Sequence, residues 1–138
     1  LITAAADTTL RIMFPMITNV EEFKLAKAIL EKELSRHQRN KRPMPKDIKV
    51  GTMLEVPSLV WQLDELLPLV DFVSIGSNDL MQFFYACDRE NPKMSNRYDT
   101  LSPSSLGMLR FIVEKCSAGN VPLTLCGEIG GEKVGALA

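Results

Sequence analysis

The chain has 138 residues, 46% of them hydrophobic and 24% charged, so its composition is that of a protein with a buried core. Its 16 Lys and Arg nearly balance its 17 Asp and Glu, and the formal net charge is -1. That balance argues against nucleic-acid and membrane-surface binders, which usually carry a basic excess. No apolar run approaches the roughly 20 residues of a membrane span, and the first residues do not read as a signal peptide.

The three cysteines are far apart in the sequence and form no CxxC motif. Such sparse, unpaired spacing argues against both a metal-binding motif and a disulfide framework. We therefore expect a cytoplasmic, reducing environment.

The first part of the chain predicts a buried strand followed by a long helix. The strand is the apolar run 11–17, which suits a position covered on both faces. The helix runs over 20–39, with Thr18 and Glu21 as its capping box. Its expected buried stripe is Phe23, Ala26, Leu30 and Leu34.

The rest of the chain repeats this alternation. Strands are expected at 48–55, 71–76 and 121–126, and a polar loop at 88–100. A helix before Pro68 packs through Leu59, Val60, Leu63, Leu66 and Leu67, and another runs from about Asn78 to Ala86. A third is capped by Ser102 and packs through Leu106, Leu109, Ile112, Val113 and Cys116.

Strands that alternate with helices predict an α/β fold with parallel βα repeats and right-handed crossovers. In such folds the reactive residues lie where strands end and helices begin. Glu55, Asn78, Asp79 and Cys126 all stand at such positions.

Glu55 and Asp79 follow neighbouring strands and are candidate ligands for Mg²⁺, which prefers a few carboxylates plus water and substrate oxygens. The alternative is that Asp79 only caps its helix and Glu55 pairs with a surface lysine. Spacing alone does not decide between the two.

Cys126 lies in Leu-Cys-Gly-Glu at a strand end, where a thiol can act as nucleophile or general acid. The alternative is an inert cysteine, which is how we interpret Cys87 and Cys116. Arg89 begins the polar loop and could bind a phosphate or carboxylate, although most such arginines form surface ion pairs.

Five blocks in register resemble enzyme I of the bacterial phosphotransferase system and its phosphoenolpyruvate-utilising superfamily. The blocks are Arg-Ile-Met-Phe-Pro-Met (11–16), Gly-Thr-Met-Leu-Glu-Val-Pro (51–57), Ser-Ile-Gly-Ser-Asn-Asp-Leu-Met-Gln (74–82), Asp-Arg-Glu-Asn (88–91) and Leu-Cys-Gly-Glu (125–128). Leu-Glu-Val-Pro-Ser and Arg-Tyr-Asp-Thr-Leu-Ser-Pro look closest to the nitrogen-related paralogue.

The resemblance implies a (β/α)₈ TIM barrel that binds phosphoenolpyruvate at the carboxyl ends of its strands. By position, Glu55 and Asp79 match the family's Mg²⁺ ligands, and Asn78 and Arg89 match phosphate-binding residues. Cys126 matches the acid-base that exchanges a proton with C3 of the enolpyruvate. Ser77 stands where the family commonly has threonine.

An eight-stranded barrel takes about 250 residues, so we expect residues 1–138 to form about four of its eight βα units. The family's phosphorylated histidine belongs to a separate domain, so we expect the isolated chain to be inactive. The implied partners are phosphoenolpyruvate, pyruvate and a phosphocarrier protein, in sugar transport or nitrogen regulation.

Two alternatives stay open at the level of sequence. One is a piece of pyruvate phosphate dikinase or phosphoenolpyruvate synthase, which share the superfamily. The other is a non-catalytic half-barrel that forms a homodimer or otherwise self-associates, because unpaired strand edges are adhesive.

Overall fold

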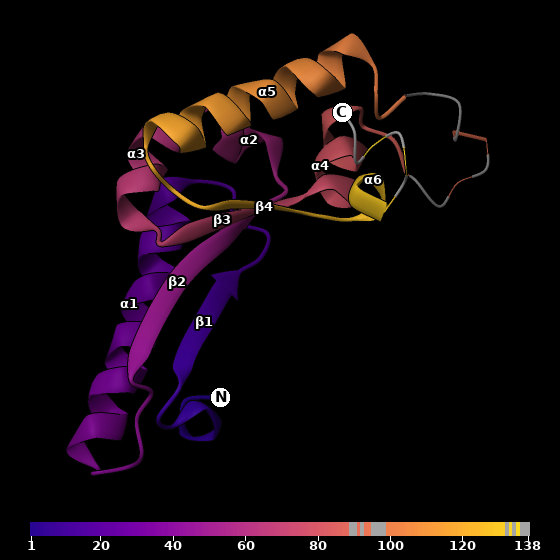
Figure 1. Ribbon diagram of the computed structural model, residues 1–138. Helices are drawn as coiled ribbons and strands as arrows, with labels where there is room; N and C mark the ends of the chain where they lie inside the picture. Colours follow the sequence, from indigo (N-terminus) through magenta and orange to yellow (C-terminus); the bar gives the residue numbers. More distant parts are fainter. Residues whose placement is uncertain (89–90, 92, 95–98, 132, 134, 136–138) are drawn as a thin grey trace.

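The computed structural model describes residues 1–138 except 89–90, 92, 95–98, 132, 134 and 136–138. Its strands are β1 (Thr9–Phe14), β2 (Asp47–Leu54), β3 (Phe72–Gly76) and β4 (Leu123–Cys126). Its α-helices are α1 (Val20–Arg39), α2 (Pro57–Val60), α3 (Leu63–Leu66), α4 (Ser77–Phe84), α5 (Pro103–Ala118) and α6 (Glu128–Gly131). Two short 3₁₀ turns are η1 (Thr3–Ala5) and η2 (Leu67–Leu69) (Figure 1).

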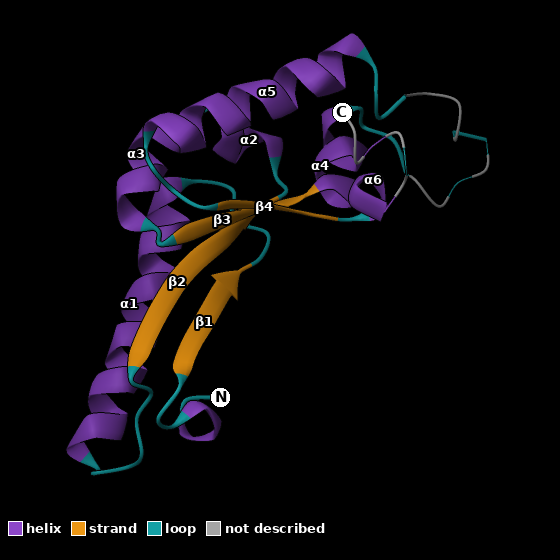
Figure 2. Ribbon diagram, viewed as in Figure 1, coloured by secondary structure: helices purple, strands orange, loops and turns teal. Residues whose placement is uncertain are grey.

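The four strands form one parallel sheet in the order β1-β2-β3-β4, which confirms the predicted α/β fold. Figure 2 shows α1, α2, α3 and α5 along one side of this sheet, whereas beside β1, away from α1, it shows only the short η1 turn near the N-terminus. Strands in sequential order with helices on one side are the arrangement of about half of a (β/α)₈ TIM barrel. No helix in the described ranges is both long and apolar enough to cross a membrane.

The core lies between the sheet and these helices. Side chains less than 2% exposed come from the sheet and from several helices, namely Phe23, Leu54, Leu59, Leu63, Leu66, Val73, Leu80 and Ile112. Burial of each such large apolar side chain contributes about 1.5–3 kcal/mol. This packing fixes the strands and therefore the positions of the residues that follow them.

The long helix α1 has the predicted bounds, but its cap lies one residue later than predicted. Asn19 is the N-cap, and its side chain accepts a hydrogen bond from the Glu22 backbone N–H. The Glu22 carboxylate in turn accepts from the backbone N–H and the hydroxyl of Thr18. These bonds lower the pKa of Glu22. Of the predicted stripe only Phe23 is fully buried, and Ala26, Leu30 and Leu34 are partly buried.

The first strand was predicted over 11–17 and instead ends at Phe14, before Pro15. Proline has no N–H to donate to a sheet, and the next residue, Met16, has a positive φ of 55°. The chain therefore turns out of the sheet at the carboxyl end of β1, and this turn reaches the candidate site.

The single helix predicted before Pro68 is wrong, because the chain forms α2, α3 and η2 in its place. The break falls at Gln62, whose side chain accepts a hydrogen bond from the Val20 backbone N–H and donates one to the Ser58 carbonyl. Gln62 thereby satisfies a free N–H at the start of α1. A tertiary contact thus overrides the local helical pattern, although all five predicted apolar residues are buried.

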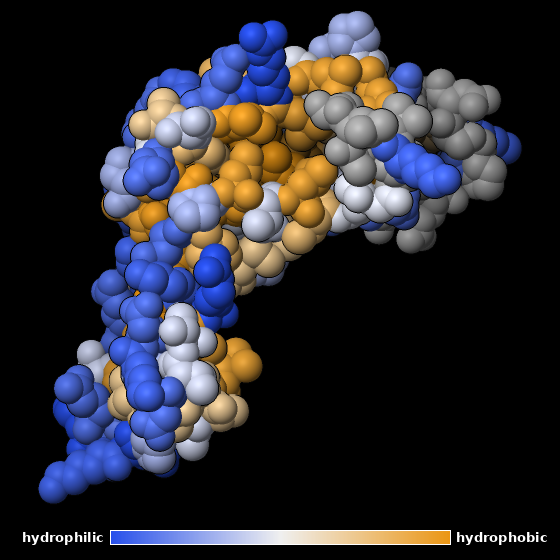
Figure 3. Space-filling model, in the orientation of Figure 1, coloured by the Kyte–Doolittle hydropathy of each residue, from blue (hydrophilic) through white to orange (hydrophobic). Residues whose placement is uncertain are grey.

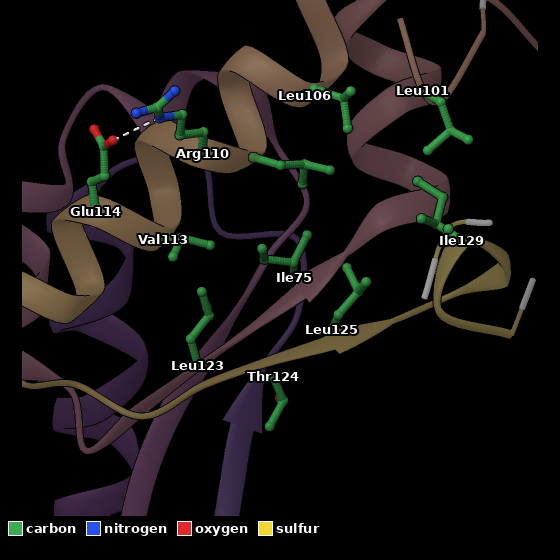
Figure 4. Close-up of a pocket in the computed structure, with 12 residues that line it drawn as sticks. Ile75, Leu101, Leu106, Arg110, Val113, Glu114, Leu123, Thr124, Leu125 and Ile129 are labelled. Carbon is green, nitrogen blue, oxygen red and sulfur yellow. Dashed lines mark hydrogen bonds and ion pairs between the residues drawn. The ribbon is translucent and has the colours of Figure 1, made fainter. Parts of the chain in front are cut away.

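The predicted face of α5 is only partly correct. Ile112 and Cys116 are buried, but Val113 is 51% exposed. It lines a groove of about 640 Å³ between α5 and β4, together with Ile75, Leu106, Leu109, Leu123 and Leu125. In Figure 4 Leu123 and Leu125 point into this groove and Thr124 points away from it. Figure 3 shows apolar surface gathered in the region of α5 and β4.

Candidate active site at the carboxyl ends of the strands

The ends of all four strands are linked to one another by direct contacts. The Met16 N–H after β1 donates to Glu55, which follows β2. Glu55 lies against Gly76 at the end of β3, and Ser77, the next residue, donates to the carbonyl of Cys126 at the end of β4. Glu55, the first turn of α4 and Cys126 therefore meet at one edge of the sheet.

Glu55 is 4% exposed and has one hydrogen bond to the residues that the structure describes, in which Oε1 accepts from the Met16 backbone N–H at 2.7 Å. No lysine or arginine in the described part of the chain pairs with it, which contradicts the alternative of a surface ion pair. A buried carboxylate without a cationic partner is costly unless other groups compensate its charge. The contacts of Glu55 within the described residues therefore do not by themselves explain why a carboxylate is buried here.

Gly76 allows Glu55 to approach the start of α4. A Cβ added at Gly76 would lie only 2.8 Å from Oε2 and 2.9 Å from Cβ of Glu55. Asn78 and Asp79 lie in the first turn of α4, both partly buried. Gly76, which contacts Glu55, is directly followed by α4. The first turn of this helix carries Asn78 and Asp79.

The two polar side chains of that turn differ in their contacts. Asn78 Oδ1 accepts a hydrogen bond from the Glu128 backbone N–H at 3.0 Å. Among the residues that the structure describes, none bonds to or pairs with the Asp79 carboxylate. The predicted alternative of a simple helix cap is not what the structure shows, because Asp79 makes no side-chain cap to α4.

Cys126 is exposed, and its Sγ lies 3.0 Å from the Ser74 hydroxyl. The side chains of Ser74 and Cys126 share one face of the sheet. Cys126 pairs with Gly76, and Ser74, two residues before Gly76, faces the same side because residues alternate along a strand. The other two cysteines, Cys87 and Cys116, are 1% exposed, as predicted for inert residues. Burial also raises the pKa of Cys116. Only the strand-end thiol is open to a ligand.

Arg89 lies outside the described residues, so the structure does not place it. Three contributors to the site were not predicted from the sequence: Met16, Ser74 and Ser77. Ser74 carried a usable signal, because it is a polar residue within an otherwise apolar buried strand. Met16 contributes only a backbone N–H, and side-chain type gives no sign of that.

Glu55 and Asp79 are chemically suited to a hard divalent cation. Both offer carboxylate oxygens without a cationic partner in the described structure, at the edge where α4 begins. Within the described ranges, no group of three or more His, Cys, Asp and Glu side chains comes together as a metal site. A cation here would need water or substrate oxygens to complete its coordination, which is the usual arrangement for Mg²⁺.

In parallel α/β folds, ligands bind at the carboxyl ends of the strands, which is where Glu55, Asn78, Asp79 and Cys126 lie. Residues 1–137 match the family model described as "PEP-utilising enzyme, PEP-binding domain", where PEP is phosphoenolpyruvate. The chain belongs to this family.

Several named proteins are similar to the chain over almost its whole length. It is 38% identical over 134 residues to a phosphoenolpyruvate-protein phosphotransferase of Bacillus subtilis, covering 97% of this chain and 24% of that protein. It is 38% identical to the Escherichia coli "Phosphoenolpyruvate-dependent phosphotransferase system" protein, covering 93% of this chain and 17% of the relative. It is 37% identical to Escherichia coli multiphosphoryl transfer protein 2, and the match covers 94% of this chain and 16% of that protein. The chain is homologous to enzyme I-type phosphotransferases, and these identities do not single out the nitrogen-related paralogue.

Proposed function

We propose that the chain is the phosphoenolpyruvate-binding part of a phosphoenolpyruvate-protein phosphotransferase. The supporting observation is that Glu55, the first turn of α4 and Cys126 are linked by direct contacts at one edge of the sheet. Membership of the PEP-binding family supplies the substrate class. The reaction transfers the phosphoryl group to a protein histidine and releases pyruvate.

In this proposal the α4 turn binds the phosphate end of the substrate. Asn78 Oδ1 is occupied by the Glu128 N–H, so its side-chain NH₂ is the group left to donate to a phosphate oxygen. Arg89 is proposed as a second phosphate ligand, because a guanidinium binds phosphate in bidentate fashion.

Cys126 is proposed as the acid that completes the reaction. When the P–O bond to phosphoenolpyruvate breaks, the electron pair stays on the enolate oxygen and the phosphoryl group passes to the histidine nitrogen. The Cys126 S–H then gives its proton to C3 of the enolate, which yields pyruvate and a thiolate. The exposed thiol is open to a ligand from solvent.

Glu55 and Asp79 are the proposed ligands of Mg²⁺. When bound, the ion would neutralise negative charge on the phosphoryl and enolate oxygens. Glu55 is held in place by the Met16 N–H through Oε1, and its Oε2 has no hydrogen-bond partner among the described residues.

We further propose that residues 1–138 form about four of the eight βα units of the barrel. The chain spans a quarter or less of these three relatives, and the apolar groove beside β4 fits the helix of a further unit. The phosphocarrier partner, the nitrogen branch and the cytoplasmic location stay predictions. A nucleotide-binding domain elsewhere in a longer protein would instead favour the dikinase or synthase class.

Calorimetric titration of the chain tests the site. We expect weak binding of phosphoenolpyruvate that requires Mg²⁺ and is lost in Glu55→Gln and Asp79→Asn. Absence of binding at millimolar substrate, or binding that both variants retain, contradicts the proposal. Phosphorylation of an acceptor protein by this chain alone would contradict the expected inactivity.

Self-association is a second candidate function, which the exposed groove favours. Val113 and Leu125 are 51% and 41% exposed, and β1 and β4 each have one strand neighbour within the described sheet. Such edges and apolar faces are adhesive. Light scattering should show a dimer that Val113→Glu dissociates, and a monomeric wild-type chain refutes this candidate.

A further inference from the structure

The turn that follows Cys126 lies against the first turn of α4 without space between them. Gly127 has a φ of +111°, a conformation that side chains other than glycine rarely adopt. A Cβ added there would overlap Ser77 Oγ and lie 2.8 Å from Asn78 Oδ1. Glycine is required at this position for both conformation and space.

Two hydrogen bonds flank Gly127 and fasten the turn on either side. The Ser77 hydroxyl donates to the Cys126 carbonyl at 2.8 Å, and the Glu128 N–H donates to Asn78 Oδ1 at 3.0 Å. Ser77 is 1% exposed, so water does not readily replace its hydroxyl. The backbone of residues 126–128 is thus fixed to α4 from both ends.

We propose that Ser77, acting with Gly127, is a positioning residue for the Cys126 thiol. The Ser77 bond fixes the Cys126 backbone, and this places Sγ 3.0 Å from the Ser74 hydroxyl. The same turn of α4 carries Asn78 and Asp79. The thiol and these two side chains, the proposed ligand-binding groups, are therefore held as one unit, which deepens the proposed function and rests on it for the thiol's chemical role.

The positioning itself can be tested without substrate or metal, because Cys126 is the one exposed cysteine and the other two are buried. The measurement is the rate of iodoacetamide alkylation of each cysteine, resolved by mass spectrometry. In Ser77→Ala the turn loses the bond that holds Cys126 Sγ beside the Ser74 hydroxyl, so the thiol should be freer to react. We expect Cys126 to be alkylated about fivefold faster, a factor that corresponds to the net contribution of one hydrogen bond. Ser77→Thr keeps the hydroxyl and should return the rate to that of the wild type.

Ser105→Ala is the matched control, because Ser105 is also a fully buried, hydrogen-bonded serine but lies on α5. It should leave the Cys126 rate unchanged. An unchanged rate in Ser77→Ala, an equal acceleration in Ser105→Ala, or no recovery in Ser77→Thr would each overturn the proposal.

Gly127→Ala is a second variant, used if Ser77→Ala fails to fold. Such a failure would be seen as alkylation of the normally buried thiols of Cys87 and Cys116. Its Cβ must displace the turn, and we expect faster alkylation of Cys126 with the buried thiols still protected. A wild-type rate in a folded Gly127→Ala protein overturns the proposal. Protection of Cys126 by phosphoenolpyruvate with Mg²⁺ is a separate result: its absence counts against the proposed function and not against the positioning by Ser77.

Discussion

Glu55 offers the sharpest separation of structural and functional roles, because replacing it with Gln and with Ala should give different outcomes. Glu55 is 4% exposed, and its Oε1 is the acceptor for the Met16 N–H at 2.7 Å. The amide oxygen of Gln can accept the same hydrogen bond, while the buried negative charge disappears. Alanine removes the acceptor altogether, so the Met16 N–H loses its hydrogen bond to residue 55.

We expect Glu55→Gln to change the free energy of unfolding by less than about 1 kcal/mol in metal-free buffer, since it loses a charge that is costly to bury but keeps the bond. Glu55→Ala should lower that free energy by about 2 kcal/mol, because a part-buried hydrogen bond to a carboxylate is lost, or roughly 8 °C in Tm for a chain of this size. Urea unfolding followed by circular dichroism measures both values.

Added Mg²⁺ then tests the second role of the same carboxylate. A cation that binds only the folded state raises the free energy of unfolding in proportion to RT ln(1 + [Mg²⁺]/Kd). The wild type should gain stability as Mg²⁺ increases, and neither variant should. The reasoning is refuted if Glu55→Gln is as unstable as Glu55→Ala, or if Glu55→Gln keeps the full stabilisation by Mg²⁺.

Three further predictions follow from contacts near and away from the site. Gly76→Ala should weaken Mg²⁺ binding at least tenfold in a calorimetric titration, because the new Cβ would lie 2.8 Å from Glu55 Oε2, and an unchanged affinity contradicts the close contact. Asp71 has a pKa below its ordinary value of 3.8 because of its bond to a backbone N–H and the Lys49 charge. Its contribution is thus fully present above about pH 4 and lost as pH falls through the folded-state pKa. Since the side chain is 39% exposed, Asp71→Asn should cost at most about 1 kcal/mol at neutral pH, and progressively less as the pH of acid unfolding falls below about 4. Cys116, whose pKa is raised by burial, should be unreactive toward a thiol reagent until the chain unfolds, so that the native protein shows a single reactive thiol.

The elements that the sequence predicted well are those with strong local signals. The helix α1 has an Asn and two acidic residues at its start and basic residues in its last turn, and its predicted bounds are the observed ones. The helix α5 begins where Ser102 caps it and Pro103 takes its first position, as predicted. In both cases the information lies within a few residues of the boundary.

The errors arose where distant residues decide the structure. The helix predicted before Pro68 is broken because Gln62 bonds to the start of α1, 42 positions away in the sequence. The exposure of Val113 depends on which element packs beside β4. The periodicity of apolar residues in α5 carries no information about that neighbour. Local pattern gives the apolar face of an element but not its neighbours.

The candidate site shows the same division between chemistry and geometry. Carboxylate, amide and thiol groups were recognisable by residue type at strand ends, so Glu55, Asn78, Asp79 and Cys126 could be predicted. The groups that hold them in place are a backbone N–H at Met16, a missing Cβ at Gly76 and Gly127, and a buried hydroxyl at Ser77.

These supporting groups connect the four strand ends in series, from the turn after β1 to the turn after β4. A shift at one strand end must therefore be accommodated at its neighbour, because Gly76 and Gly127 have no spare volume around them. Substitutions at neighbouring strand ends should for this reason not be additive, whereas one strand end and a distant residue of α5 should be. The candidate site is then a single packed unit, in which a substitution at one strand end is expected to shift the side chains at the next.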